Sequence, residues 1–397
     1  MLTHSFYESD NRVIRYAQAL AERGDVVRVA ALGRSPQQAR VELMRGVELH
    51  RIQDRFDKGG DSAWSYLSPL LRFTHRGAAW LAHCRAEAPI DAVHVHNIPD
   101  FLVFAALPSK LRGARVILDI HDIVPEFFAS KFGRGEGSML VRGLRAMERA
   151  SAAVADRVIL ANHLWLDRYA QRNAAAGKCS VVINHVDEQL FQPAPTKASF
   201  SDSPLILFPG GLQKHQGLDI AIRAFARLRG RIPGARFHIY GDGNCKAELV
   251  AQAASLGVGE SLRFFDPLPL RDIVRVMAQA DLAVVPKRAD SFGNEAYSTK
   301  IMEFMALGVP VVASNTQVDR YYFDDSVLRF FESGNDEALA HAMADVLGNA
   351  PLRQAMVARA AEYARRNSWS QHKQGYLDVI DALLAKPAAA IPLADRS

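Results

Sequence analysis

The sequence predicts an α/β protein made of two doubly wound domains, each with a parallel sheet between layers of helices. The chain has 397 residues, more than one hydrophobic core usually organises. Short apolar runs of β type alternate with longer helical patterns in both halves, which is typical of βαβ units with parallel strands. A proline-rich stretch, Gln-Pro-Ala-Pro-Thr at 192–196, separates the two series, because proline continues neither a helix nor a central strand.

Each element of the first half follows from its residue pattern. Apolar, β-branched runs predict strands at 26–32, 47–52, 92–96, 116–120, 157–161 and 180–183. Amphipathic patterns predict helices at 11–23, 62–88, 101–111, 139–155 and 164–175. Before the first helix, residues 1–5 supply only a stub of a first strand, shorter than the roughly five or six residues that are usual.

The second half repeats the alternation. Strands are predicted at 205–208, 236–240, 262–265, 282–285 and 309–312, and helices at 218–229, 246–256, 270–280 and 299–307. Residues 337–384 are almost all helical in pattern. We therefore place one domain at 1–190 and a second at 191–397, and expect the C-terminal helices to pack back on the first domain.

Composition excludes several classes of protein. Hydrophobic residues make up 49% and charged residues 23% of the chain, as in soluble globular proteins. The three cysteines lie far apart, which fits neither a disulfide framework nor a metal site. The longest apolar run, residues 101–107, is far shorter than the roughly 20 residues that span a bilayer. No signal-peptide pattern is visible at the start, so we expect a cytoplasmic protein.

The charge balance is weakly basic. The formal net charge is +5, and residues 1–190 hold 25 basic against 21 acidic side chains, compared with 23 and 22 in residues 191–397. This excess is too small to predict nucleic-acid binding.

A phosphate-binding segment follows the predicted strand 282–285. Ligands of open parallel sheets bind beyond the carboxyl ends of the strands, and here a loop of small and polar residues leads into a helix near Ser298 and Thr299. Free N–H groups at a helix start suit a diphosphate, and Lys300 adds a positive charge. Glu303 lies on the same helical side as Lys300, where a carboxylate can accept both hydroxyls of a ribose. From the residues alone, a surface pair of Lys300 and Glu303 is equally acceptable.

The same segment carries a family resemblance. Glu295, seven residues, Glu303 and then Phe-Met-Ala-Leu-Gly-Val-Pro resemble the E-x7-E signature of the family 4 (group 1) retaining glycosyltransferases. Further segments match the family in order: Asn-His-Val-Asp at 184–187 with Phe-Gln-Pro at 191–193, Tyr-Gly-Asp-Gly at 240–243, and Ala-Asp-Leu at 280–282 with a proline at 286. The resemblance implies the GT-B fold, two Rossmann-like domains facing each other across a cleft, and a metal-independent sugar transfer.

The resemblance also implies roles for residues. In the family, the first glutamate lies by the donor sugar and the second binds the nucleotide ribose, and these roles fall to Glu295 and Glu303. The backbone after the first glutamate meets the sugar and phosphates, so the expected donor site includes Asn294, Ala296, Tyr297, Ser298, Thr299 and Lys300. The family's usual Gly-Phe-Gly and proline are replaced here by Ala-Tyr-Ser-Thr-Lys. A register that begins at Asp290 is an alternative, but it needs an insertion, and the spacing to Glu303 favours Glu295.

A second departure lies in residues 208–217, Phe-Pro-Gly-Gly-Leu-Gln-Lys-His-Gln-Gly. They align with the family's G-R-L-x-x-x-K-G loop, whose arginine and lysine bind the diphosphate, but those positions are Gly211 and Gln216 here. We expect Gly210 and Gly211 in the donor site, with Lys214 and Lys300 replacing the missing charges. A fixed cation lowers the barrier to diphosphate departure by up to about 4 kcal/mol. The alternative is that Lys214 points to solvent.

His121 is the predicted catalytic residue of the first domain, together with Glu295 of the second. It follows the strand 116–120, faces the cleft and resembles the family's cleft histidine; Asp122 and Glu126 are expected to orient it.

Four further residues are predicted on the acceptor side: Glu8, Asp10, His96 and Asn97. Glu8 and Asp10 lie in an acidic loop after the first strand, and their carboxylates suit sugar hydroxyls. His94 and His96 point to one face of their strand, an arrangement that also occurs in metal sites. We favour a cleft wall or a core position for the pair, and therefore expect no metal.

A basic segment in the first domain combines cations with large apolar residues at helical spacing. Its cations are Lys131, Arg134, Arg142, Arg145 and Arg149. Such a face suits transient docking on an anionic membrane, and an ordinary amphipathic surface helix is the alternative.

The sequence thus predicts a hexosyl-type glycosyltransferase without a cofactor, acting in exopolysaccharide, lipopolysaccharide or glycolipid synthesis. Its partners are a nucleotide diphosphate-sugar donor and a glycan or lipid-linked acceptor. A nucleotide-sugar 2-epimerase of the same fold and an inactive nucleotide-binding partner subunit remain open. The missing loop cations favour the inactive subunit, whereas Glu295, Glu303 and His121 oppose it.

Overall fold

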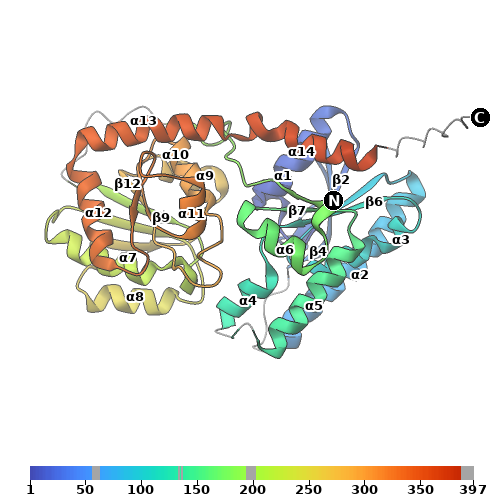
Figure 1. The fold of residues 1–397 in the computed structure, drawn as a ribbon, viewed down its shortest axis with the longest axis horizontal. Helices are drawn as coiled ribbons and strands as arrows, with labels where there is room; N and C mark the ends of the chain where they lie inside the picture. The colour runs from blue at the N-terminus through green and yellow to red at the C-terminus, as the bar shows by residue number, and fades with distance from the viewer. Residues whose placement is uncertain (56–62, 133–134, 136, 194–202, 386–397) are drawn as a thin grey trace, which may run out of the picture.

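Two α/β domains lie side by side in the structure (Figure 1), and the predicted fold class is confirmed. The structure is a computed structural model that describes residues 1–55, 63–132, 135, 137–193 and 203–385. Within these ranges the first parallel sheet ends at Val181 and the second begins at Leu205.

The first domain is built on an eight-stranded sheet with the order β3-β4-β2-β1-β5-β6-β7-β8 in the described residues. Of these described strands, β3 alone runs antiparallel to its neighbour. The strands are β1 (Leu2–Thr3), β2 (Val27–Gly33), β3 (Val41–Met44), β4 (Val47–Asp54), β5 (Ala92–His96), β6 (Arg115–Ile120), β7 (Arg157–Leu160) and β8 (Cys179–Val181).

Helices cover both faces of this sheet. They are η1 (Tyr7–Ser9), α1 (Asn11–Arg23), α2 (Ala63–Glu87), η2 (Asp100–Ala106), α3 (Leu107–Lys110), α4 (Val124–Phe132), α5 (Met139–Val154), η3 (His163–Trp165), α6 (Leu166–Arg172) and η4 (Ala176–Lys178). The bounds of α1 have clear causes. The Asp10 carboxylate accepts the N–H of Val13 at its start, and Gly24 ends it in a left-handed conformation.

In residues 203–385, the second domain has a six-stranded parallel sheet in the order β11-β10-β9-β12-β13-β14. Its strands are β9 (Leu205–Pro209), β10 (Arg236–Tyr240), β11 (Leu262–Phe265), β12 (Leu282–Val285), β13 (Val311–Ser314) and β14 (Arg329–Phe331). Its helices are η5 (Lys214–Gln216), α7 (Leu218–Arg229), α8 (Lys246–Ser255), α9 (Leu270–Met277), α10 (Thr299–Ala306), α11 (Gln317–Tyr322) and α12 (Asp336–Gly348).

The last two helices, α13 (Ala350–Arg366) and α14 (Trp369–Leu384), carry the chain back to the first domain (Figure 1). The ring of Tyr376 in α14 stacks on Tyr16 of α1, with 3.9 Å between ring centres. At the crossing, Val186 pairs with Ser368 as an isolated β-bridge. The chain therefore crosses between the domains twice at adjacent places.

Among the strands and α-helices of the described residues, four were not predicted: β3, β14, α4 and α11. β3 is an exposed edge strand, so it lacks the apolar run of a buried strand. It is joined to β4 by Arg45 and Gly46, both with positive φ angles, as a tight hairpin turn requires. The first strand is short, as expected, yet β1 is central and pairs with both β2 and β5.

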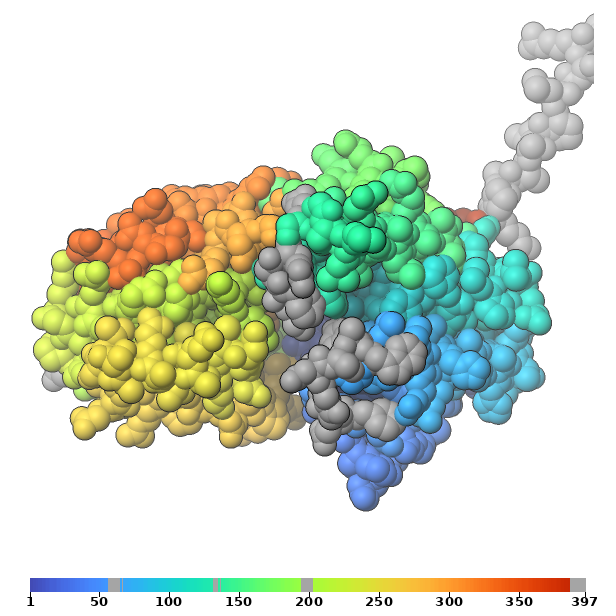
Figure 2. Space-filling view, turned by 90° about the horizontal axis from the view of Figure 1, so that it is seen from below, coloured from blue at the N-terminus to red at the C-terminus, as the bar shows by residue number. Residues whose placement is uncertain are grey.

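A cavity of about 970 Å³ lies between the domains. Most of its lining comes from the first domain, and Thr299 and Glu303 of α10 line it from the second. Seen from below in Figure 2, the two domains form separate lobes.

Candidate active site

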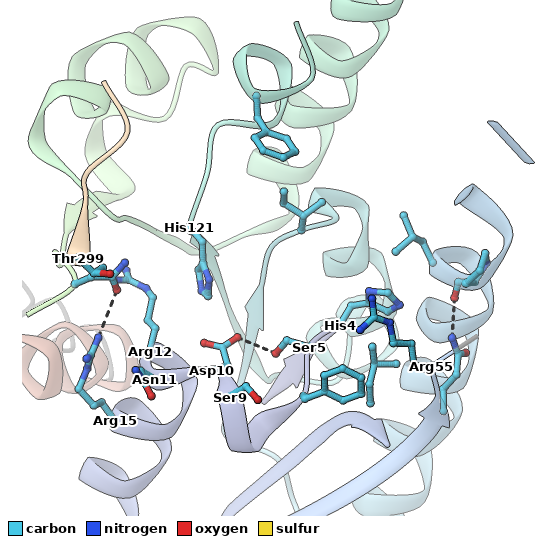
Figure 3. A pocket seen from close by; sticks show the side chains of 18 of the residues that line it. His4, Ser5, Ser9, Asp10, Asn11, Arg12, Arg15, Arg55, His121 and Thr299 are labelled. Carbon is cyan, nitrogen blue, oxygen red and sulfur yellow. Dashed lines mark hydrogen bonds between the residues drawn. The ribbon is translucent and has the colours of Figure 1, made fainter. Parts of the chain in front are cut away.

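His121 lines the cavity directly after β6 (Figure 3). Asp119 holds it there. Its Nε2 lies 3.0 Å from Oδ2 of Asp119, which is fully buried inside β6. The same carboxylate accepts two hydrogen bonds from Arg12, at 2.8 and 2.7 Å, and lies 2.9 Å from Nδ1 of His96. Asp119 therefore fixes His121 and is itself fixed from α1.

Neither expected orienting residue is hydrogen-bonded to His121 in the described part of the chain, although the charges of Asp122 and His121 interact. The carboxylate of Glu126 accepts a hydrogen bond from Arg172 at 2.6 Å, and the backbone carbonyl of Asp122 accepts one from Asn97. The sequence did hold a signal for Asp119, because a residue two positions before His121 on a strand points to the same face.

Charge in this cluster favours a protonated His121. Burial disfavours the imidazolium, but the Asp119 carboxylate outweighs it, and the pKa of His121 is raised above its ordinary value. Burial likewise opposes the Asp119 carboxylate, yet Arg12 and His121 hold its pKa well below the usual range. His121 is thus suited to donate a proton or hydrogen bond into the cavity.

His96 and Asn97 lie behind His121 and do not line the cavity. Nδ1 of His96 is 3.2 Å from Nε2 of His121. The Asn97 side chain accepts the backbone N–H of His121 at 2.7 Å and donates to Asp100. The structure therefore gives both residues a supporting position and not the expected place on the acceptor side.

His94, His96 and Asp119 bring their ligand atoms within 4.8 Å of one another. Asp119 is already bound by Arg12, and Nδ1 of His94 lies 3.2 Å from the hydroxyl of Tyr376. A cation there would sit beside the buried Arg12 guanidinium, so we assign the group to the core.

The acidic loop after β1 brings Asp10 but not Glu8 to the cavity. The Asp10 carboxylate accepts hydrogen bonds from the Ser5 hydroxyl at 2.8 Å and from the Val13 N–H. Glu8 forms an ion pair with Arg51 and accepts from Gln38. Glu8 is therefore tied to the sheet rather than available to an acceptor.

Lys300 lies under the glycine loop that follows β9. Its Nζ is 3.3 Å from Oε1 of Gln216 and 5.2 Å from the centre of the Phe208 ring. Gly210 has a φ of 141°, and a Cβ there would lie 3.1 Å from Nζ of Lys300, so the loop needs glycine at this position. Burial lowers the pKa of Lys300 to about 8. Lys300 thus reaches the place expected for a diphosphate-binding cation.

The two other residues predicted on this loop point elsewhere. Lys214 begins η5 and is exposed, which matches the solvent alternative. Gly211 faces the side chain of Gln213. A lysine that was not predicted, Lys287, is buried after β12, where its Nζ pairs with Asp319 at 2.9 Å and donates to the Ala296 carbonyl at 2.7 Å. Its signal was a lysine two residues after the end of a buried strand.

Thr299 and Glu303 are the predicted donor residues that face the cavity. Thr299 opens α10, Glu303 lies one turn further, and the two side chains are hydrogen-bonded. Burial raises the pKa of Glu303, although Lys300, Thr299 and Arg15 oppose the shift. Lys300 points to the glycine loop and Glu303 to the cavity, so they do not form a simple surface pair.

Glu295 sits at the contact between the domains and does not line the cavity. Its carboxylate pairs with Arg168 of α6, and its backbone carbonyl accepts from Asn162 at 3.0 Å. The neighbouring predicted residues do not line the cavity either. Asn294 accepts the Gln317 N–H, Ala296 packs against the first-domain core, Tyr297 packs on Tyr322 and Ser298 is buried.

Comparison with known proteins agrees with this arrangement. Residues 10–185 match the glycosyl transferase 4-like domains, and residues 194–363 match the glycosyl transferases group 1. The chain is 30% identical over 344 residues to the D-inositol 3-phosphate glycosyltransferase of Acidothermus cellulolyticus, covering 80% of this chain and 74% of that protein. The chain belongs to the group 1 glycosyltransferases. It is therefore a transferase enzyme, as predicted.

Solved structures show the same fold as this glycosyltransferase. Sucrose-phosphate synthase from Thermosynechococcus elongatus aligns with a TM-score of 0.74 at 17% identity, over 94% of this chain and 93% of that one. Anabaena HepE in complex with UDP-glucose aligns with a TM-score of 0.70 at 16% identity, over 96% and 98% of the two chains. The predicted GT-B architecture is thereby confirmed.

The described residues of the glycosyltransferase contain no helix that is both long and apolar enough to cross a membrane.

The first domain contributes a cavity residue that the sequence did not single out, Arg15 of α1. Arg15 lies four residues after Asn11 and faces the cleft. A helix-face analysis of α1 alone does not distinguish it from a surface arginine.

Proposed function

We propose that this glycosyltransferase takes a hexosyl-type sugar from a nucleotide diphosphate-sugar and transfers it, with retention, to a glycan or lipid-linked acceptor. The observation that carries the proposal is the opposition of Thr299 and Glu303 to His121 across one cavity. A structural neighbour, Anabaena HepE, was solved with UDP-glucose, which favours a donor of that class.

Each part of the site has a role in this reaction. The start of α10 and Lys300 receive the diphosphate, where a half-buried cation and free N–H groups stabilise the departing charge without a metal. Glu303 accepts hydrogen bonds from the ribose. His121, held by Asp119, acts at the reacting sugar, and Glu295 belongs to the sugar end of the donor site. Asp10 and the first-domain lining receive the acceptor.

We place the enzyme in the cytoplasm, in exopolysaccharide, lipopolysaccharide or glycolipid synthesis, with transient docking on the inner membrane face. Met139 and Leu140 at the start of α5 are 88% and 46% exposed, beside the exposed Arg142. The basic face is narrower than the sequence predicted, because Arg149 donates to the Arg172 carbonyl and Arg145 faces Glu126. Arg134 and the side chain of Lys131 lie outside the described residues.

Calorimetry with UDP and GDP, followed by turnover assays of the matching nucleotide-sugars, tests the proposal. We expect one nucleotide to bind and its sugar to be transferred in the presence of a chelator. A change in the donor sugar without an acceptor would instead identify a 2-epimerase. Nucleotide binding without any turnover would identify an inactive partner subunit, and activity that requires magnesium or manganese would contradict the metal-free site.

A further inference from the structure

Arg15 is a buried arginine whose hydrogen-bonding capacity the protein leaves largely unused (Figure 3). It is 9% exposed, and its only hydrogen bond among the described residues is a 3.5 Å contact from Nη2 to Oδ1 of Asn184. Its Nε is buried without a partner in that part of the chain. Its guanidinium also lies 5.9 Å from the centre of the Trp369 ring.

The neighbouring Arg12 has a structural role, and its hydrogen bonds provide a comparison for Arg15. Arg12 makes two hydrogen bonds to Asp119, one to the Val182 carbonyl and one to Asn184. A buried guanidinium without such partners is costly. Since Arg15 lines the cavity, its spare donors are available to an anion that enters.

The charges around Arg15 come from both domains. They are Arg12 and Tyr16 from α1, Asp187 at the domain crossing, and Glu303 of α10 in the second domain. Arg15 is therefore near enough to Glu303 to interact with it, in the same cavity as Thr299 at the start of α10.

The second domain supplies few cations to this place. Gly211 and Gln216 occupy the positions where the family's loop carries its two charges, Lys214 is exposed, and Lys287 is paired with Asp319. Of these residues, Lys300 is the one that reaches the loop without an ion pair in the described part of the chain, as a half-buried ammonium that donates to Gln216. A diphosphate held there would be incompletely neutralised from its own domain.

We propose that Arg15 binds the phosphates of the donor nucleotide from the first domain, across the cleft. This inference rests on the proposed nucleotide-sugar donor. The guanidinium gains charge-assisted hydrogen bonds to phosphate oxygens. Because Thr299 and Glu303 line the same cavity from the second domain, the bound phosphates join the two domains through Arg15.

The test compares Arg15→Gln, Arg15→Lys and a matched control, Arg23→Gln, for binding of a nucleoside diphosphate and of the nucleoside alone by calorimetry. Arg23 lies on the same helix but pairs at the surface with Asp25 and Asp381. We expect Arg15→Gln to weaken diphosphate binding by about tenfold to a hundredfold and to leave nucleoside binding unchanged. Arg15→Lys should fall between, and Arg23→Gln should match the wild type.

Equal diphosphate affinity of Arg15→Gln and the wild type would overturn this inference and leave the proposed function intact. Absence of nucleotide binding to the wild type would overturn both. If Arg15→Gln does not fold, phenylglyoxal labelling of the wild type decides the matter by mass spectrometry. The diphosphate, but not the nucleoside, should protect Arg15, and equal labelling in both would contradict the proposal.

Discussion

The carboxylate of Glu295 in the second domain is bound to the guanidinium of Arg168 in the first. The two residues are 127 positions apart in the chain, and the Glu295 carbonyl is also held by Asn162. The loop that leads into α10 is therefore positioned by the opposite domain. This makes the placement of the donor loop dependent on how the domains meet.

We predict that Arg168→Ala lowers kcat by about tenfold, because small losses of positioning at a reacting centre cost rate. Affinity for the nucleoside diphosphate should change little, since that ligand lacks the sugar expected near Glu295. Steady-state kinetics and calorimetry measure the two quantities. Arg275→Ala, which removes an exposed pair with Asp272 in α9, serves as the control. An equal loss of diphosphate affinity would place Arg168 at the phosphates instead.

We predict that His121→Ala lowers kcat by about a hundredfold or more, with less than a tenfold change in donor affinity. The side chain faces the cavity and is held by Asp119, as a group that acts on reacting atoms must be. Asp119→Asn should also lower kcat and should destabilise the fold by about 3–5 kcal/mol, because it leaves buried Arg12 without its carboxylate. Near-normal turnover of His121→Ala at saturating substrates would remove the catalytic role.

We predict that nucleoside diphosphate binding weakens as the pH rises above about 8. The pKa of Lys300 is lowered to about 8 by burial, so the free protein carries the ammonium below that pH and loses it above. The loss should approach tenfold per pH unit. Calorimetry across this range tests the effect, and Lys300→Arg should flatten the profile. An unchanged affinity up to about pH 9 in the wild type would show that Lys300 does not bind the diphosphate.

We predict that Glu303→Ala weakens nucleoside diphosphate binding by about tenfold to a hundredfold while the melting temperature stays close to that of the wild type. A carboxylate that accepts ribose hydroxyls contributes charge-assisted hydrogen bonds, and its removal from a cavity wall leaves the core intact. The 2′-deoxy nucleotide provides the internal control. It should bind more weakly than the ribonucleotide to the wild type, and the difference should shrink in Glu303→Ala.

Much of the fold was predictable because buried parallel strands have a recognisable sequence pattern. The strands 236–240, 262–265 and 282–285 were predicted with the bounds that the structure shows, since each is a β-type run bounded by turn or polar residues. The exposed edge strand β3 and the three-residue β14 lack that signal. Two residues of the cavity, Glu303 and His121, were predictable as well. Both come after a parallel strand, and ligands bind beyond the carboxyl ends of such strands.

The remaining site geometry depends on contacts that no local pattern encodes. Arg12 reaches Asp119 across 107 residues and Asn162 reaches Glu295 across 133. The direction in which a long side chain points cannot be predicted from the local sequence either. Lys214 and Lys300 looked equivalent in the sequence, but Lys214 is exposed, whereas Lys300 is half-buried beneath Gly210.

The last prediction concerns the apolar start of α5. We predict that the protein sediments with vesicles of phosphatidylglycerol and phosphatidylcholine more than with pure phosphatidylcholine, and that salt releases it. The exposed Met139 and Leu140 supply apolar area and Arg142 a charge, each basic residue near an anionic surface contributing about 1 kcal/mol. So small a patch supports only weak binding, with a dissociation constant of about 1 mM.

Met139→Ser combined with Arg142→Glu should abolish vesicle binding without disturbing the core, because both side chains are exposed. Arg271→Glu, on α9 of the second domain and also exposed, makes the same change of charge and should retain binding. Equal, negligible sedimentation with both vesicle types would favour a soluble acceptor. An equal loss of vesicle binding in the double variant and in Arg271→Glu would show that net charge, and not the start of α5, determines the binding.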